Sequence, residues 1–285
     1  MARLPDWMKP IVGGLVAIGL LGLVEGGLRL AGLPDPGLYA GDLVWSWTLR
    51  PGLDRAVPGP DGDFVVTTNA LGLRGPLPPE DAPFTLILGC STSFGWGVSA
   101  EEAWPARLEA ASGARVVNGA VPGWSTEQAR RSGAALLALG PQRVILAFGV
   151  RDAQAAARPD AEAQPSPPAA SFALARALRA LIARPAAVAP PSGPPRVSPA
   201  RFAENLRALA TAARPAAVWV MVFPQPSRLV EYIDAAAQIG PVWSPELPAG
   251  DFFATDPIHL TAAGHAHLAE AAVAAEASGE WRPWP

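Results

Sequence analysis

The chain contains few of the residues from which metal and disulfide sites are built. It has one cysteine and three histidines among 285 residues. A single cysteine excludes an internal disulfide and a thiolate metal cage. Only one of the 22 basic residues is a lysine, Lys9, and the arginines are dispersed through a chain of net charge −3. Nucleic-acid-binding proteins carry a clustered basic surface, so we expect no nucleic-acid partner.

The histidines do not suggest a metal either. His265 and His267 lie in a Gly-His-Ala-His segment that opens an alanine-rich stretch, without a carboxylate cluster at ligand spacing. We therefore expect these two to be surface or capping residues of a helix. The sequence predicts no metal and no cofactor.

One long apolar run lies near the N-terminus. From Ile11 to Leu33 only Glu25 and Arg29 are charged, and as a helix this segment would span about 34 Å at ~1.5 Å per residue, enough to cross a bilayer core. Glu25 and Arg29 are four residues apart and can pair. The uninterrupted part, Ile11 to Val24, has the length of a signal-peptide core. No small-x-small cleavage site is followed by a plausible mature start, so we expect a retained anchor.

Basic residues set the expected orientation of this anchor. Arg3 and Lys9 precede the apolar run, and the positive-inside rule places such a flank in the cytoplasm. The remainder of the chain would then be exported. The alternative is a buried core helix, which the glycines and the following Pro/Gly-rich segment fit poorly.

Composition divides the rest of the chain. Residues 34–63 are rich in Pro, Gly and Asp and are predicted to be irregular, before a β-rich run at 64–68. We therefore expect a cytoplasmic stub and anchor at 1–33, an irregular linker with a short β segment at 34–83, and a catalytic domain at 84–285.

Strand and helix patterns alternate within residues 84–285. Strands are predicted at 84–89, 115–118, 143–148 and 216–223, and helices at 101–111, 127–139, 199–213 and 262–277. This order predicts an α/β three-layer sandwich with a central parallel sheet. A Pro/Ala-rich insertion at about 158–197 interrupts it. Its amphipathic segment, 171–184, would form a lid, lie against the membrane or a partner, or pack against the domain.

A serine follows the first predicted strand, and an Asp-x-x-His lies far downstream. The apolar run from Phe84 to Gly89 would present Ser91 at the carboxyl end of a buried strand, where α/β proteins bind ligands. A serine hydroxyl needs a base to become a nucleophile, and an imidazole oriented by a carboxylate is the usual one. Asp256 and His259 supply both groups.

In this context the chain resembles the SGNH (GDSL-type) hydrolase superfamily. Four blocks carry the resemblance in order: Gly-Cys-Ser-Thr-Ser-Phe-Gly-Trp-Gly at 89–97, Asn-Gly-Ala-Val-Pro-Gly at 118–123, Gly-Val-Arg-Asp at 149–152, and Asp-Pro-Ile-His at 256–259. The resemblance implies a flavodoxin-like fold, with Ser91 as nucleophile, His259 as general base and Asp256 as its orienting acid. Residues 69–75 resemble a stretch that precedes the serine block in membrane-anchored bacterial members.

Three positions depart from the family pattern. Cys90 stands where the family has Asp, and a thiol nucleophile at this position is a conceivable alternative to Ser91. The family's oxyanion hole maps onto Ser91, Ala120 and Arg151. Ala120 replaces a glycine but retains the backbone N–H. Arg151 replaces an Asn whose loss typically costs about 100- to 1000-fold in rate; it would either donate to the oxyanion or pair with a carboxylate at the rim of the sheet.

These observations predict an extracytoplasmic serine esterase or acyl hydrolase on cell-envelope or exported carbohydrate esters. The catalytic domain would lie in the periplasm or outside the cell, on a single-pass anchor in a bacterial cytoplasmic membrane. Two alternatives remain open. One is an O-acyltransferase acting on an exported polysaccharide with a membrane-bound acyltransferase partner, and the other is a non-catalytic carbohydrate-binding or scaffold relative.

Overall fold

The computed structural model describes residues 5–35, 37–43, 45–166, 172–182, 192–223 and 229–284. The chain forms two compact units. One comprises Met1–Gly37 and Pro165–Ala189, and the other comprises Leu38–Gln164 and Pro190–Pro285. We refer to the first as the N-terminal unit and to the second, which contains most of the predicted catalytic domain, as the catalytic unit, and we describe each by itself.

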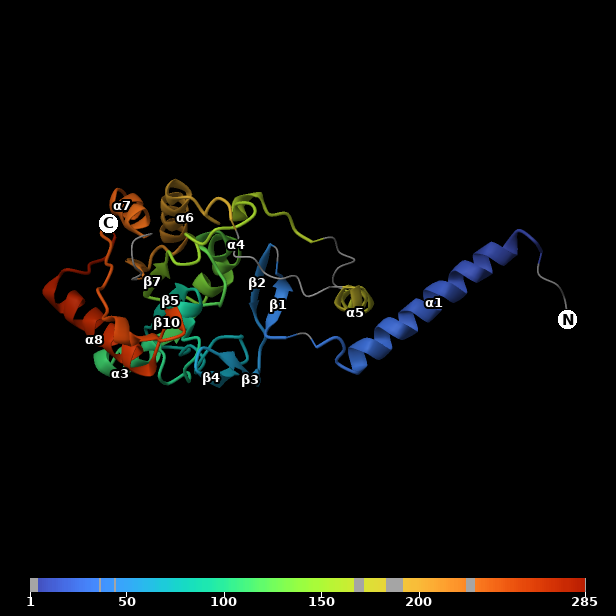
Figure 1. Ribbon diagram of the computed structural model, residues 1–285, viewed down its shortest axis with the longest axis horizontal. Helices are drawn as coiled ribbons and strands as arrows, with labels where there is room; N and C mark the ends of the chain where they lie inside the picture. Colours follow the sequence, from blue (N-terminus) through green and yellow to red (C-terminus); the bar gives the residue numbers. More distant parts are fainter. Residues whose placement is uncertain are drawn as a thin grey trace. The chain divides into compact units, whose positions relative to one another are not determined.

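A parallel sheet forms the centre of the catalytic unit (Figure 1). Its strands are β5 (Thr85–Gly89), β6 (Val116–Asn118), β7 (Arg143–Phe148) and β8 (Ala217–Val222), in the order β6-β5-β7-β8, and every neighbouring pair is parallel. All of β5 and most of β7 are buried, which explains why both are apolar runs without alternation. The carboxyl ends of these strands therefore share one edge of the sheet.

Helices cover both faces of this sheet. Helices α3 (Trp104–Ser112) and α8 (Ala262–Ser278) pack together on one side, and α4 (Thr126–Leu137), α6 (Pro199–Ala212) and α7 (Val230–Ala237) lie on the other (Figure 1). The predicted three-layer α/β fold is confirmed. Helix starts follow from capping residues: the side chains of Ser125, Ser198 and Thr261 accept hydrogen bonds from the first turns of α4, α6 and α8.

The prediction that residues 34–63 are irregular was wrong. It contains β1 (Tyr39–Asp42), β2 (Ser46–Leu49) and β3 (Asp54–Gly59); β1 pairs with β2, and β3 pairs with β4 (Gly62–Thr67). The glycines that suggested coil form turns, as at Gly62 with its φ of +101°. A two-stranded ladder also accommodates Pro58. Leu49, Val57 and Phe64 are buried in the core of the unit, so these hairpins are packed structure.

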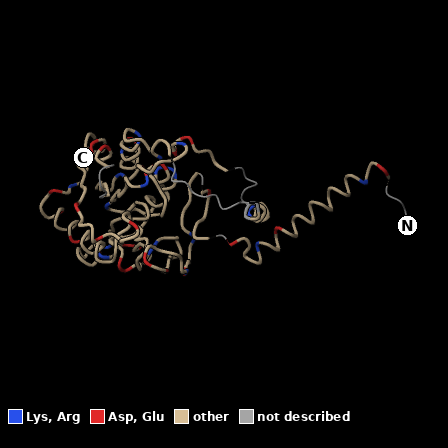
Figure 2. The backbone as a smooth tube through the Cα atoms, in the orientation of Figure 1, with Lys and Arg blue, Asp and Glu red and all other residues tan. Residues whose placement is uncertain are grey.

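The described residues of the N-terminal unit form two helices, α1 (Met8–Leu30) and α5 (Ala173–Ile182). Helix α1 has a mean hydropathy of 2.0 over its most apolar window, and none of its residues is buried. Figure 2 shows that charged residues are confined to the two end portions of α1. By length and composition this helix can span a membrane, and its exposure is not that of a core helix. The parts of the predicted insertion at 167–171 and 183–191 lie outside the described residues.

Candidate active site

Ser91 occupies a tight strand-to-helix turn. Strand β5 ends at Gly89, and after Cys90 the chain enters the short helix α2 (Ser91–Phe94). A Cβ at Gly89 would lie 2.7 Å from the Ser93 hydroxyl and 2.8 Å from the Ala147 carbonyl oxygen, so only glycine fits there. As the first residue of α2, Ser91 has a backbone N–H without an acceptor in the helix. The turn thus presents both the hydroxyl and the N–H of Ser91 at the carboxyl edge of the sheet.

Two side chains hold the other end of α2. The buried guanidinium of Arg74 donates to the carbonyl oxygens of Phe94, Gly95 and Val98, and lies 4.3 Å from the Phe94 ring centroid. Burial lowers the pKa of Arg74 to about 10, so it stays charged at neutral pH. The Asn118 amide donates to the Ser93 carbonyl at 3.2 Å. Sequence reasoning did not single out Arg74, although it lies in the 69–75 stretch.

His259 and Asp256 are presented by a β-hairpin. Strand β10 (Asp256–Leu260) pairs with β9 (Phe252–Phe253). The Nε2 atom of His259 lies 2.8 Å from the Ser91 hydroxyl, and its Nδ1 atom lies 2.6 Å from an Asp256 carboxylate oxygen. Backbone N–H groups of Ile258 and His259 donate to the other Asp256 oxygen. The three side chains predicted from sequence therefore form one continuous hydrogen-bonded series.

The environment keeps His259 neutral and Asp256 ionised. Burial lowers the pKa of His259 below its usual range against the opposing effect of Asp256, and the charge of Arg151 lowers it further. Burial opposes ionisation of Asp256, but hydrogen bonds from His259 and Ile258 hold its pKa below the usual value. A neutral imidazole beside a hydroxyl can accept its proton, and a carboxylate on the far nitrogen stabilises the resulting cation.

The predicted oxyanion donors differ in how they are engaged. The Ala120 N–H donates to the Asn118 side-chain oxygen at 3.1 Å, so it reaches an oxyanion only by sharing that hydrogen bond. Arg151 donates through Nη1 to Gln154 at 2.9 Å. Among the described residues no carboxylate pairs with Arg151, and its buried Nε has no hydrogen-bond partner. The described residues therefore do not contain the ion pair between Arg151 and a carboxylate at the rim of the sheet that was one alternative predicted from the sequence.

Asp152 fixes the turn that carries Arg151. It is fully buried and accepts hydrogen bonds from the N–H and hydroxyl of Thr126 and from the N–H of Gly149. Burial raises the pKa of Asp152 to about 6 against these hydrogen bonds. Gly149 has a φ of +119°, a conformation that favours glycine. The turn after β7 is thereby tied to the start of α4.

Cys90 lies beside the site without contacting its base. Its side chain is buried, and Sγ lies 3.1 Å from the Thr92 hydroxyl, whereas the Ser91 hydroxyl contacts His259. This geometry favours Ser91 over Cys90 as the group that His259 can deprotonate.

His265 was predicted to be a surface or cap residue of its helix, and the structure corrects this. It is buried, and its Nδ1 accepts a hydrogen bond from the Trp104 N–H at 3.2 Å. Burial lowers the pKa of His265 to about 3, with a further contribution from the charge of Arg74. The physical reason is packing: α8 lies against α3, and a neutral imidazole satisfies a donor at the α3 N-terminus. His267 is half exposed and lies 2.8 Å from Asp251.

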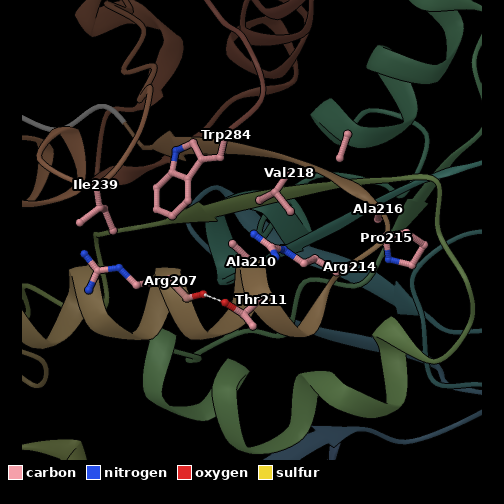
Figure 3. Close-up of a pocket in the computed structure, with 10 residues that line it drawn as sticks. Arg207, Ala210, Thr211, Arg214, Pro215, Ala216, Val218, Ile239 and Trp284 are labelled. Atoms are coloured by element: carbon pink, nitrogen blue, oxygen red, sulfur yellow. Dashed lines mark hydrogen bonds between the residues drawn. The ribbon is translucent and has the colours of Figure 1, made fainter.

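The catalytic unit also has a cavity of about 560 Å³ at a different place. Figure 3 shows its lining, which includes Arg207, Arg214 and Trp284 and the first residues of β8. Because β5 and β8 run parallel in the sheet, the start of β8 lies at the edge opposite Ser91. The cavity is therefore not part of the Ser91 site. No group of three or more His, Cys, Asp or Glu suited to a metal occurs among the described residues.

Comparisons with solved structures find similar chains at low sequence identity. A putative lipolytic protein of the G-D-S-L family from Desulfitobacterium hafniense is 16% identical, with a TM-score of 0.45 over 67% of this chain and 98% of that chain. The crystal structure of TesA is 20% identical, with a TM-score of 0.41 over 66% and 94%. A family two carbohydrate esterase from Clostridium thermocellum, in complex with cellohexaose, is 14% identical, with a TM-score of 0.43 over 76% and 68%.

A search of curated proteins gave no significant match. A family model, by contrast, covers most of the catalytic unit: the GDSL-like Lipase/Acylhydrolase family matches residues 87–267. That range contains the Ser91 turn, the Arg151 turn and the β9–β10 hairpin, and it spans more than half of the chain. The chain belongs to the GDSL-like lipase/acylhydrolase family, within the SGNH hydrolase superfamily.

Proposed function

We propose that this protein is a serine esterase that transfers an acyl group from an ester to Ser91 and then to water. The observation that carries the proposal is the series Ser91–His259–Asp256, with contacts of 2.8 and 2.6 Å. His259 takes the proton of the Ser91 hydroxyl as its oxygen attacks the ester carbonyl, and Asp256 stabilises the imidazolium. The proton then passes to the leaving alkoxide, leaving an acyl-Ser91 ester that water hydrolyses by the same base.

Charge develops on the carbonyl oxygen during both steps. The Ser91 N–H is the first donor, because it has no acceptor in α2. Arg151 supplies a second, cationic donor, and its charge already lowers the pKa of His259. The Ala120 N–H contributes by sharing its hydrogen bond with Asn118. A permanent positive charge in a partly dry site stabilises an oxyanion more than a neutral amide would.

The test uses a fluorophosphonate probe, which reacts with an activated serine whatever the substrate. We expect one adduct on the intact chain, lost in Ser91→Ala and retained in Cys90→Ser. Labelling that survives in Ser91→Ala, or disappears in Cys90→Ser, contradicts the assignment. Absence of labelling in the unaltered chain favours a non-catalytic carbohydrate-binding relative.

The substrate class follows from the proposed location. We propose that α1 anchors the chain in a bacterial cytoplasmic membrane and that the catalytic unit acts outside the cytoplasm on esters of envelope or exported carbohydrates. Supporting observations are the exposed apolar surface of α1 and the basic residue Lys9 at its start. A sugar hydroxyl reacts with the same acyl-Ser91 ester as water does, so product analysis with an added oligosaccharide separates esterase from acyltransferase.

The topology has its own test. Alkaline phosphatase is active only outside the cytoplasm, and we expect an active enzyme when it is fused after Pro285. An expressed but inactive fusion contradicts the proposed orientation and leaves the chemistry of Ser91 untouched.

A further inference from the structure

Glu25 is the only acidic residue of α1, and both of its carboxylate oxygens are engaged. Arg29 donates to it through Nε at 2.6 Å, and the backbone N–H groups of Ala173 and Leu174 donate at 2.9 Å each. An ionised carboxylate in an apolar helix is costly unless it is paired. Glu25 has three donors.

Two of these donors belong to the first turn of α5. Such N–H groups have no acceptor inside their own helix, and a carboxylate at this position also interacts favourably with the helix dipole. Glu25 thus acts as the N-terminal cap of a helix far away in the sequence. Because it lies five residues before the end of α1, or roughly 8 Å at ~1.5 Å per residue, it fixes α5 beside the C-terminal end of the apolar helix.

Helix α5 also has an apolar side. Leu174, Leu178 and Leu181 recur at helical spacing and form one stripe. Beyond the half-buried Leu174, the side chains of Phe172, Leu178 and Leu181 are 51%, 53% and 82% exposed. The adjoining end of α1 is also apolar and exposed, with Leu30 at 93%. The two helices, which are in contact, therefore both expose apolar side chains.

We propose that α5 is an interfacial helix and that its partner is the lipid bilayer, into whose outer surface Phe172, Leu178 and Leu181 insert beside the end of α1. This inference rests on the proposed membrane anchoring of α1. Interfacial helices bury their apolar face about 5–10 Å into the headgroup region. At ten residues and ~1.5 Å per residue, α5 is about 15 Å long, too short to cross the bilayer.

This placement changes how the catalytic unit is attached. The insertion leaves the catalytic unit after Gln164 and rejoins it at Pro190. With α5 at the membrane surface, the catalytic unit is joined to that surface by the segments around residues 37, 164 and 190, rather than by the first alone. Such attachment suits an enzyme whose ester substrate is held at the membrane.

The test measures membrane depth with a spin label on the full chain in phospholipid vesicles. Leu181→Cys carries the label, Ile18→Cys in the middle of α1 gives a bilayer reference, and Glu270→Cys on the exposed side of α8 gives a water reference. The chain without an added cysteine measures background labelling at the buried Cys90. We expect the label at 181 to be reached by oxygen more than by a water-soluble nickel chelate, at a depth between those of the two references.

Glu25→Leu tests the cap itself. Loss of an N-terminal cap shifts the docked-to-undocked equilibrium of a helix roughly fivefold, so nickel access to the label at 181 should rise in Glu25→Leu. Glu25→Gln retains one carbonyl acceptor and should have the smaller effect. Equal access in all three chains overturns the cap.

Two other results overturn the lipid assignment. Nickel access at 181 equal to that at 270 means an aqueous surface, and protection from both reagents means a protein partner or a lid. If the label at position 18 is itself exposed to water, the anchor has failed, and that failure is distinct from a failure of α5 alone.

Discussion

The Ser91 turn and the Arg151 turn follow adjacent strands, β5 and β7, yet they are built differently. Around Ser91, Arg74 and Asn118 hold the carbonyl groups at the end of α2, and His259 contacts the hydroxyl. Around Arg151 the buried Asp152 holds the backbone, while among the described residues the arginine side chain makes one hydrogen bond, to Gln154. The proposed nucleophile is thus held at both ends of α2, and we call its turn the fixed side of the site; the turn of Arg151, the proposed cationic donor, is the adjustable side.

The largest effect should come from a substitution on the fixed side of the site, at Asp256. We expect Asp256→Asn to lower the acylation rate of Ser91 by roughly 10⁴-fold, because an amide leaves His259 without its orienting carboxylate. The release of p-nitrophenol from an activated ester measures this rate. The matched control is Asp251→Asn, which alters the carboxylate beside His267 and should leave the rate close to that of the unaltered chain. Similar losses in both variants would mean a general effect on folding.

Substitutions of Arg151 test the adjustable side of the site. We expect Arg151→Ala to lower the acylation rate by about 100-fold or more, because it removes a donor to the oxyanion, and Arg151→Asn to retain much of the rate. Removing the charge should also raise the pKa of His259, so the acid limb of the pH–rate profile moves to higher pH.

Gln154→Ala is the matched control for Arg151. It removes the hydrogen bond that the guanidinium donates to Gln154 and should not lower the rate. If all four chains have equal rates and pH profiles, Arg151 has no part in the chemistry.

Sequence predicted the fixed side better than the adjustable one. The strand predicted at 84–89, which contains β5, and the roles proposed for Ser91 and His259 depend on local patterns that hydrophobic runs and short motifs reveal. Helix starts at Ser125, Ser198 and Thr261 follow local capping chemistry.

The contacts that sequence could not reveal connect distant segments. Arg74 reaches α2 from a preceding loop, and His265 becomes a core residue only because α8 packs on α3. The strands at 39–59 were missed because proline and glycine are as frequent in tight turns as in coil, whereas the β-rich run predicted at 64–68 overlaps β4. Glu25 binds α5 across more than half of the chain, a pairing that no local pattern encodes.

Substitution of Arg74 tests whether the hydrogen bonds that hold the C-terminal end of α2 affect the reaction of Ser91. We expect Arg74→Met to lower kcat roughly 10- to 100-fold with little change in KM, since a small displacement of a reacting group costs this much. Arg74→Lys should restore part of the loss. Assays at a temperature where each variant is folded separate this effect from stability.

Arg143→Met is the matched control for Arg74. Arg143 lies at the start of β7, away from Ser91, and its largely buried guanidinium pairs with Glu276. The substitution should lower stability without lowering kcat. A parallel loss of kcat in both variants would make Arg74 a purely structural residue.

The smallest effect concerns the loss of folding stability at acid pH, which we expect His265 to contribute to. His265 lies within electrostatic reach of Arg74 and His259, and its pKa is lowered to about 3, whereas a histidine in an unfolded chain titrates near 6.5. Between these values the unfolded chain binds the proton and the folded chain does not. Stability therefore falls as the pH falls from about 6.5 towards 3, by up to ~1.4 kcal/mol per pH unit from this group.

His265→Asn should remove this dependence, because its side-chain oxygen can replace Nδ1 as acceptor for the Trp104 N–H without gaining a charge. The smaller side chain leaves a cavity that costs on the order of 1 kcal/mol at pH 7.5, so the variant starts less stable and loses less on acidification. Urea unfolding of the full chain in detergent, followed at several pH values, measures both terms. His267→Asn, on the exposed side of α8, is the matched control. If the free energy of unfolding falls equally with pH in His265→Asn and in the unaltered chain, the buried imidazole does not cause the loss of stability at acid pH.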